Sequence, residues 1–171
     1  MPPLIVLCSA IYNAIPICEP ENQETKPFQF VHISRLEFYK NLQVIIKSLP
    51  IVKELFPNVI LIVIGEGSFR ENLEKLVISL NLQKNVIFKG HVSAHEKNII
   101  LSSSCALVFP SLHEGFGMVI LEAFAQQKPV LVSRIRPMSD IVEHEHTGLV
   151  ISPHDENDWA QALKYLLQNP Q

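Results

Sequence analysis

Short apolar runs alternate along the chain with longer segments in which apolar residues recur every three or four positions. The runs predict six β-strands, over residues 28–34, 59–64, 86–88, 105–109, 130–133 and 149–151. Several of them are apolar throughout, which is typical of strands in a parallel sheet whose two faces are both covered.

The segments between the runs predict helices. The first helix ends before Pro57 and carries an apolar stripe made of Leu42, Ile45, Ile46, Leu49 and Val52. Further helices are predicted over 69–79, 94–102, 117–126, 138–143 and 155–167. Because strands and helices alternate and crossovers are right-handed, the pattern predicts a Rossmann-like three-layer α/β sandwich with a mostly parallel six-stranded sheet. Such sheets bind ligands at the carboxyl ends of their strands.

The N-terminal segment differs in composition from the rest. Five of the 12 prolines lie within the first 27 residues, and residues 18–27 are polar and acidic. Prolines remove backbone donors and few apolar side chains are available for burial, so the segment predicts a linker. We divide the chain into an N-terminal segment and linker, 1–27, and a Rossmann-like domain, 28–171. Residues 4–12 are either a short strand or the end of a larger unit.

The charge and cysteine content exclude several classes of protein. The chain is 47% hydrophobic and 18% charged with a net charge of -3, so it has no basic field for nucleic acid or an anionic membrane. Its three cysteines lack C-x-x-C spacing, which argues against a disulfide framework and a zinc site and favours a reducing, cytoplasmic location. The apolar run 4–8 is too short to span a bilayer.

The loop after the first predicted strand carries two cations. Arg35 and Lys40 bracket the turn into the next helix, where they oppose the helix dipole. Their placement therefore suggests a bound anion such as a diphosphate. The alternative is solvated surface charge or a salt bridge to Glu37.

The loop after the second predicted strand, Gly65-Glu66-Gly67-Ser68, superficially begins a dinucleotide fingerprint. Arg70 stands where that fingerprint has its last glycine, and the loop does not follow the first strand. A plain glycine turn, with Ser68 capping the next helix, is the favoured interpretation.

The loop over 109–123 has the strongest pattern. Gly115 and Gly117 flank a helix start and leave the amides from Phe116 to Val119 unpaired, which suits an anion. Glu114 and Glu122, eight residues apart, could face one crevice at different depths and accept hydrogen bonds from sugar or ribose hydroxyls. Otherwise Glu114 is a helix cap and Glu122 a surface residue.

The string PSLHEGFGMVILEAFAQQKPVLVS resembles the E-x7-E signature of the retaining, GT-B-type glycosyltransferases of group 1, and Glu114 and Glu122 match its spacing. ISRLEFYKN resembles the G-R-L-x-x-x-K-N loop of that family, VIGEGSFRENLEKLV its G-x-G-x5-L segment and VIFKGHVS its F-x-G-x-V segment. HTGLVISPHDENDWAQAL resembles its closing T-G-L-x-x-x-P stretch. The resemblance runs in order from about Phe28 to the end of the chain.

The resemblance implies the C-terminal half of a GT-B fold, which binds a UDP- or GDP-sugar donor without metal or cofactor in glycan biosynthesis. Arg35 and Lys40 would neutralise the diphosphate. Glu114 would be the catalytic residue that holds the donor sugar, and Glu122 would accept from the ribose. The loop around His91 would lie along the base. Backbone at the helix start would complete the phosphate site, through Gly115, Phe116, Gly117, Met118 and Val119.

The sequence departs from the family pattern in three ways. Ser34 replaces a glycine. Arg134 and Arg136 stand where G-G-x-x-E is common, and they either affect the choice of substrate or lie on the rim of the crevice without a role in binding. The family's acceptor-binding N-terminal domain is missing or a separate chain, so we expect the isolated domain to transfer sugar hardly at all. Through that domain the enzyme would also lie peripheral to a membrane. The alternatives are a non-catalytic nucleotide-sugar-binding or assembly module and, less favoured, a related epimerase.

Overall fold

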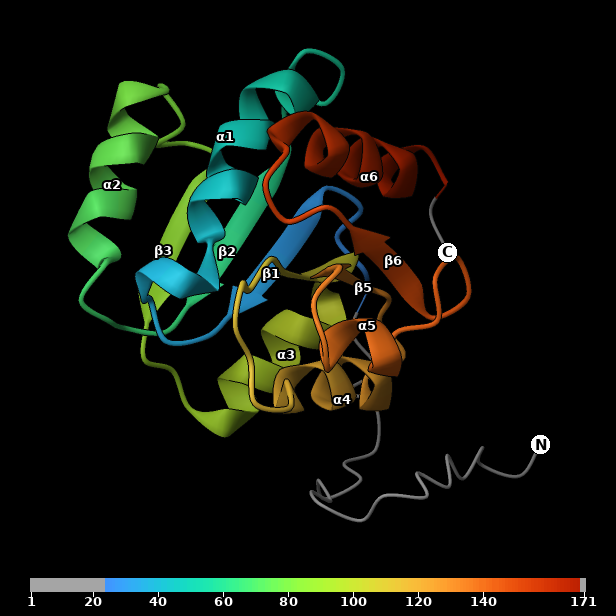
Figure 1. The fold of residues 1–171 in the computed structure, drawn as a ribbon. Helices are drawn as coiled ribbons and strands as arrows, with labels where there is room; N and C mark the ends of the chain where they lie inside the picture. The colour runs from blue at the N-terminus through green and yellow to red at the C-terminus, as the bar shows by residue number, and fades with distance from the viewer. Residues whose placement is uncertain (1–23, 170–171) are drawn as a thin grey trace.

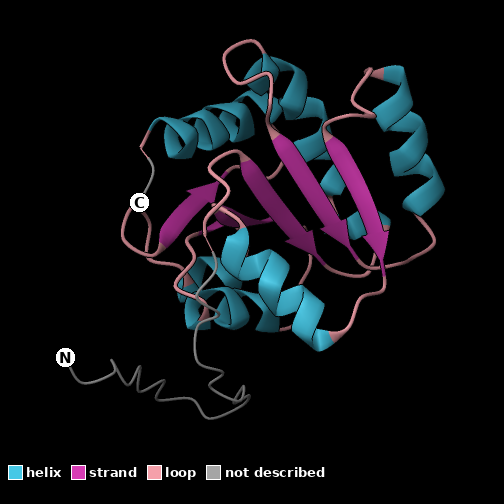
Figure 2. Cartoon of the chain, turned by 180° about the vertical axis from the view of Figure 1, so that it is seen from behind, coloured by secondary structure: helices cyan, strands magenta, loops and turns pink. Residues whose placement is uncertain are grey.

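A computed structural model describes residues 24–169 of the protein and contains one six-stranded sheet (Figures 1 and 2). Its strands are β1 (Gln29–Ile33), β2 (Ile60–Ile64), β3 (Val86–Gly90), β4 (Ala106–Phe109), β5 (Val130–Ser133) and β6 (Gly148–Ile151). They lie in the order β3-β2-β1-β4-β5-β6, and every neighbouring pair is parallel.

Helices cover both faces of the sheet (Figure 1). One face carries α1 (Leu42–Lys53), α2 (Arg70–Ser79) and α6 (Glu156–Gln168), and α1 packs against both of the others. The other face carries α3 (Ala94–Ser103), α4 (Met118–Ala125) and the short α5 (Met138–Ile141). The chain is therefore a three-layer α/β sandwich.

The strands divide their side chains between two apolar cores. In β1, Phe30 packs into the core beneath α1 and α6, whereas Val31 packs into the core beneath α3 and α4, and both are fully buried. Trp159 of α6 is fully buried in the first core. Successive strand residues point to opposite faces, so burial on both sides explains why the strands are continuously apolar.

The predicted fold class is confirmed, and the sheet is parallel throughout. Each predicted strand and helix is present, with ends that shift by a few residues; β3, for example, extends to Gly90 and α5 already ends at Ile141. The sequence analysis missed a 3-10 helix, η1 (Phe38–Lys40), in the loop before α1.

The order in which successive strands are added to the sheet reverses between β1 and β4, the two strands at the centre of the sheet. In open α/β sheets this switch point leaves a crevice outside the carboxyl ends of the strands. The loops that follow β1 and β4 meet there, and they are the two loops that carry Arg35, Lys40 and Glu114.

The start of the described chain is attached to the domain, since the Lys26 amide donates to the Ser103 carbonyl at 2.8 Å. The predicted strand at 4–12 lies outside the described residues, and the division of the chain at residue 27 stays a prediction. None of the helices between residues 24 and 169 has the length and apolar character needed to cross a bilayer.

The loops after β1 and β2 touch backbone to backbone. The Leu36 amide donates to the Glu66 carbonyl at 2.8 Å. Gly65 has φ +128°, and a Cβ added there would lie 1.8 Å from the Ser34 carbonyl oxygen. Only glycine fits this contact, which holds the loop carrying Arg35 against the second loop.

We expect Gly65→Ala to destabilise the domain by about 2 kcal/mol or more, because both the backbone conformation and the contact with Ser34 must change. Gly115→Ala is the matched control, since an added Cβ there meets nothing within 4 Å and should change stability by less than about 0.5 kcal/mol. Urea unfolding followed by circular dichroism measures both, and equal stabilities of the two variants would contradict the role of Gly65.

Candidate functional site

The loop after β1 sets its two cations in different surroundings. The Arg35 guanidinium is exposed and donates to the Tyr39 hydroxyl at 3.0 Å, and within residues 24–169 it forms no ion pair. Lys40 ends η1, and its side chain is only 10% exposed. Asn41 takes the left-handed conformation between η1 and α1, and its side-chain amide donates to the Pro153 carbonyl at 2.8 Å. This contact anchors the backbone next to Lys40.

The loop after β4 is joined to η1 by a backbone bond and an ion pair. The Leu112 amide donates to the Tyr39 carbonyl at 2.8 Å. Lys40 Nζ lies 2.5 Å from Glu114 Oε2, and the Glu114 side chain is 17% exposed. The ammonium also lies 5.4 Å from the centre of the Phe109 ring. Two predicted site residues, 74 positions apart in sequence, therefore share a largely desolvated contact at the switch point.

The start of α4 offers free backbone donors beside this pair. Gly117, at φ +83°, precedes the helix without a side-chain cap. No described residue accepts a hydrogen bond from the Met118 or Val119 amide. The Gly115 amide donates to Glu114 Oε1 at 3.1 Å. The predicted exposure of amides at this helix start is thus present, and such an end attracts anions.

A second ion pair links α3 to α4. Lys97 Nζ lies 2.7 Å from Glu122 Oε2, with side chains 24% and 28% exposed. The sequence analysis did not select Lys97, because it lies in a helix outside the recognised motifs and about 25 residues from its partner. Only the packing of α3 beside α4 brings the two together.

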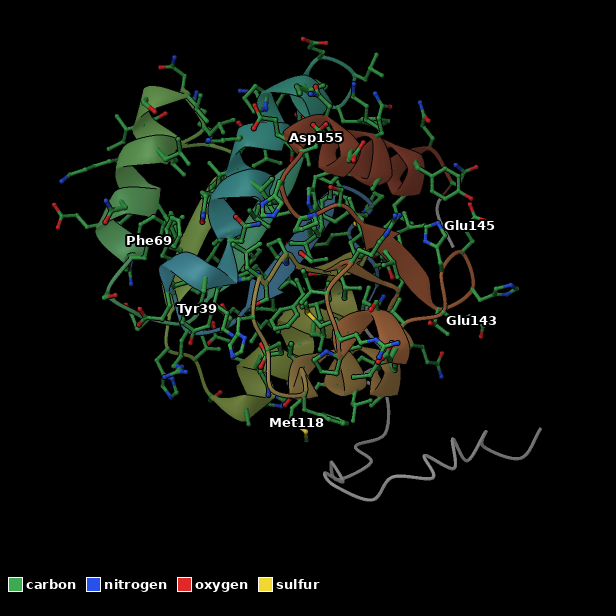
Figure 3. All side chains as sticks on the ribbon, viewed as in Figure 1. Tyr39, Phe69, Met118, Glu143, Glu145 and Asp155 are labelled. Atoms are coloured by element: carbon green, nitrogen blue, oxygen red, sulfur yellow. The ribbon has the colours of Figure 1, made fainter. Side chains whose placement is uncertain are left out.

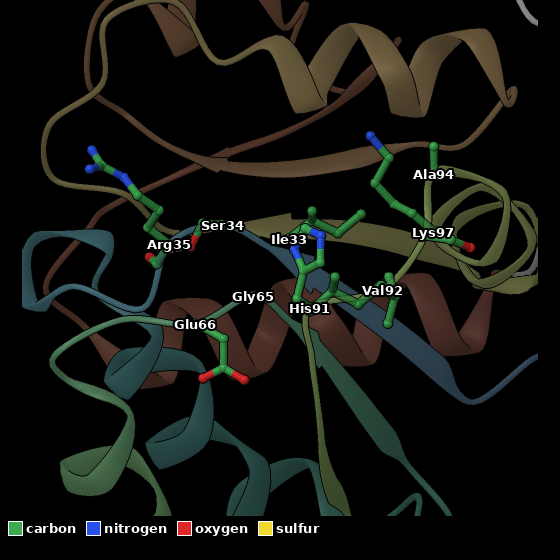
Figure 4. A pocket seen from close by; sticks show the side chains of 11 residues that line it. Ile33, Ser34, Arg35, Gly65, Glu66, His91, Val92, Ala94 and Lys97 are labelled. Atoms are coloured by element: carbon green, nitrogen blue, oxygen red, sulfur yellow. Dashed lines mark hydrogen bonds between the residues drawn. The ribbon is translucent and has the colours of Figure 1, made fainter.

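A pocket of about 620 Å³ opens at the carboxyl ends of β1, β2 and β3 (Figure 4). Its polar side chains are Ser34, Arg35, Glu66, His91, Ser93 and Lys97. Figure 4 shows the side chains of Arg35 and Lys97 directed to one side of the pocket and that of Glu66 to the other. Of the predicted site residues, Arg35 and His91 line this pocket directly.

The remaining predicted residues lie outside the lining and adjoin it to different degrees. Glu122 adjoins the pocket through Lys97, which lines its wall. Lys40 and Glu114 are connected to it through Tyr39, which contacts Arg35 and precedes Lys40 in η1. Tyr39 is labelled in Figure 3. The site is consequently a chain of contacts around the crevice, and its two carboxylates are held by different lysines.

The loop after β2 has a structural role. The Ser68 hydroxyl donates a hydrogen bond to Glu37 at 2.7 Å. Hydrogen bonding from Ser68 lowers the pKa of the Glu37 carboxyl. Ser68 does not cap α2, whose N-cap is Phe69 without a side-chain bond, so that expectation was wrong. The rest of the loop makes the glycine turn that was predicted, in contact with the loop after β1.

His32 lies directly behind the site in β1. Its ring is fully buried, with Nδ1 2.9 Å from the Val108 carbonyl oxygen and Nε2 2.8 Å from Ser34 Oγ. Burial, assisted by the positive charge of Lys40, lowers the pKa of His32 to about 4. The imidazole is neutral at pH 7 and adds no charge beside Lys40.

Known proteins are similar to this chain in both sequence and fold. A family model described as glycosyl transferases group 1 matches residues 17–171. The O-antigen chain mannosyltransferase RfbU of Salmonella typhimurium is 31% identical over 162 residues, which cover 95% of this chain and 45% of that protein. The chain spans less than half the length of the curated relatives it matches.

Two solved structures are similar to the domain. The crystal structure of TarM superposes with a TM-score of 0.84 at 27% identity and covers 91% of this chain and 31% of TarM. The crystal structure of Anabaena Alr3699/HepE in complex with UDP superposes with a TM-score of 0.76 at 25% identity, over 84% of this chain and 40% of that one.

We predict that His32 makes the domain less stable as the pH falls. The unfolded chain binds a proton at His32 below about pH 6.5, whereas the folded chain resists protonation until about pH 4. This difference should cost about 2 kcal/mol between pH 7 and pH 5. Urea unfolding measures the free energy of unfolding of the parent and of His32→Gln at pH 7 and at pH 5. The difference between the two proteins should change with pH, and taking this difference removes the contribution of other groups. A difference independent of pH would contradict the prediction.

Proposed function

Because the chain belongs to the glycosyl transferases group 1 family, we propose that its pocket binds the donor of a sugar transfer, a nucleoside-diphosphate sugar. The main support is the linkage of Glu114 to Lys40 and of Glu122 to Lys97 around one crevice. A ligand with an anionic centre and hydroxyl groups on both sides matches this alternation of lysines, carboxylates and unpaired amides.

The diphosphate would lie between the loop after β1 and the start of α4. Among the described residues the Arg35 guanidinium donates only to the Tyr39 hydroxyl, so its other N–H groups stay available beside the pocket that Arg35 lines. Lys40 is bound to Glu114 in the free protein, so a diphosphate would compete with that carboxylate for its ammonium. The free amides of Met118 and Val119 would add donors and the positive end of the helix dipole.

The nucleoside would extend along β3 and α3. Glu122 has one carboxylate oxygen held by Lys97 and a second that can accept from the ribose hydroxyls. His91 lines the pocket at the end of β3, where a base would lie. The UDP in the Alr3699/HepE crystal structure supports a nucleoside diphosphate as the ligand class, and UDP and GDP remain the two candidates here.

Glu114 would hold the hydroxyls of the transferred sugar and favour the positive charge that develops on its ring. In the transfer, the bond between the anomeric carbon and the diphosphate oxygen breaks, and the electron pair leaves with the diphosphate. The acceptor oxygen bonds to the same face of the carbon, and its proton passes to the departing phosphate oxygen. Arg35, Lys40 and the α4 amides would stabilise the leaving charge, so this assignment needs no metal.

Acceptor recognition would take place on a second Rossmann-like domain that faces this one across the crevice. A transfer site has to align donor and acceptor and exclude water, and one wall of a crevice supplies neither. We therefore propose that the domain described here binds the donor and acts as an enzyme only together with that second domain.

We expect UDP or GDP to bind the 171-residue chain and Arg35→Gln to weaken the binding about 10- to 100-fold, because a charged hydrogen bond to the diphosphate is lost. Lys40→Met should weaken it similarly. Isothermal titration calorimetry with UDP, GDP and ADP measures both effects and identifies the preferred base.

Two further variants make this test specific. Lys75→Met also removes one lysine ion pair, but Lys75 and its partner on α2 are both at least 70% exposed, so nucleotide binding should stay unchanged. The double variant Lys40→Met with Glu114→Gln shows whether a loss comes from Lys40 itself or from the carboxylate that it leaves unpaired. Binding that is absent in the parent, or untouched by loss of both Arg35 and Lys40, would refute the proposed function.

Lys97→Met should weaken nucleotide binding by about 3- to 10-fold, because the Glu122 carboxylate loses the partner that orients it. The Lys75→Met control removes an ion pair of the same 2.7 Å length whose side chains are 70% and 76% exposed. If the Glu122 carboxylate accepts hydrogen bonds from the ribose hydroxyls, Lys97→Met should no longer reduce the affinity when 2′-deoxy- and 3′-deoxynucleotides replace the ribonucleotide. A loss of equal size for deoxynucleotides would contradict the assignment.

A further inference from the structure

The contacts of Ser34 restrict which ligand atoms the pocket wall can receive. The Ser34 hydroxyl has one hydrogen, and two possible acceptors lie at 2.8 Å from its oxygen, the Arg35 carbonyl and, if the ring carries its hydrogen on Nδ1, His32 Nε2. Both belong to the protein, so the hydrogen is used internally whichever of them it meets. The part of Ser34 that lines the pocket therefore presents lone pairs.

The ring of His32 decides between the two acceptors. A carbonyl oxygen only accepts, so the contact with Val108 requires the hydrogen of the neutral ring on Nδ1. Nε2 is then an acceptor, and in its fully buried position the Ser34 hydroxyl is the donor beside it. The Arg35 carbonyl has a second donor, the Glu37 amide at 3.0 Å, and does not depend on Ser34.

A charged ring would satisfy all of these contacts together, but its surroundings oppose it. His32 has no exposure to water, and the ammonium of Lys40 acts on it from the loop after β1. Between residues 24 and 169 the ring contacts a carbonyl and a hydroxyl and no carboxylate, so an imidazolium beside Lys40 would lack a compensating anion. The neutral ring with its hydrogen on Nδ1 is thus the stable form.

We infer that Ser34, oriented by the buried His32, accepts a hydrogen bond from a hydroxyl group of the bound donor and does not contact its phosphates. This inference rests on the proposed function. Phosphate oxygens are acceptors and would meet lone pairs at Ser34, whereas the neighbouring Arg35 offers them free donors on the same wall (Figure 4). Two consecutive residues thereby provide a place for hydroxyls at Ser34 and a place for anions at Arg35. The hydroxyl belongs to the ribose or to the transferred sugar.

Calorimetric titration of the parent and of Ser34→Ala with inorganic pyrophosphate, UDP and UDP-glucose tests this, with the guanosine pair as a parallel series. We expect pyrophosphate to bind both proteins equally and Ser34→Ala to weaken a hydroxyl-bearing ligand about 3- to 10-fold. Equal loss for UDP and UDP-glucose, abolished by deoxyribose, assigns the ribose; loss for UDP-glucose alone assigns the transferred sugar.

Other outcomes overturn the inference. If Ser34→Ala weakens pyrophosphate as strongly as the nucleotides, the serine donates to phosphate; if it changes no ligand, the serine has no contact. A parent chain that binds no nucleotide refutes the proposed function itself, whereas a parent that binds with an unaffected Ser34→Ala refutes only this inference. Ser34→Thr, which keeps the hydroxyl, should restore the affinity that Ser34→Ala loses.

Nuclear magnetic resonance of the ligand-free chain provides an independent readout. Long-range proton–nitrogen correlation at pH 7 should show the His32 ring with its hydrogen on Nδ1 and a bare Nε2, and Ser34→Ala should shift the Nε2 resonance. A hydrogen on Nε2, alone or with one on Nδ1, would refute the orientation assigned to the Ser34 hydroxyl.

Discussion

The ion pair between Lys40 and Glu114 connects the two halves of the sheet at the point where its strand order reverses. A lysine with a side chain only 10% exposed requires a partner, and the carboxylate comes from a loop 74 residues away. Its formation depends on the bond between Leu112 and Tyr39 and on the left-handed Asn41, which set the two loops face to face. The pair adjoins the pocket through Tyr39, which contacts Arg35 in the pocket lining.

The crevice balances its charges within the protein. Glu114 and Glu122 are each held by a lysine and Glu66 by Arg70, while Arg35 and the first amides of α4 keep donors from which no described residue accepts. The neutral His32 behind the wall adds no further charge. Donors for an anion thus coexist with acceptors for hydroxyls over a short distance, and the polarity of each position follows from hydrogen-bond partners inside the domain.

Much of the candidate site could be predicted from loop composition, because glycines and charges at strand ends have few structural reasons to occur together. Arg35, Lys40, Glu114 and Glu122 were selected from such patterns as predictions, and His91 from the family resemblance alone. Lys97 and His32 were not, since a lysine in a helix and a histidine within an apolar strand match ordinary positions of both elements. The 3-10 helix before α1 was also missed, because three residues are too few to show a period.

By itself the sequence determined the kinds, order and approximate limits of the strands and helices, because backbone periodicity and two-sided burial act over neighbouring residues. It also determined the class of fold, since alternation and crossover handedness leave few arrangements. Only the tertiary structure decided which lysine holds which carboxylate and that the buried His32 ring lies within hydrogen-bond distance of Ser34. These depend on distances between loops far apart in the chain, and a hydrogen bond forms or fails within a few tenths of an ångström.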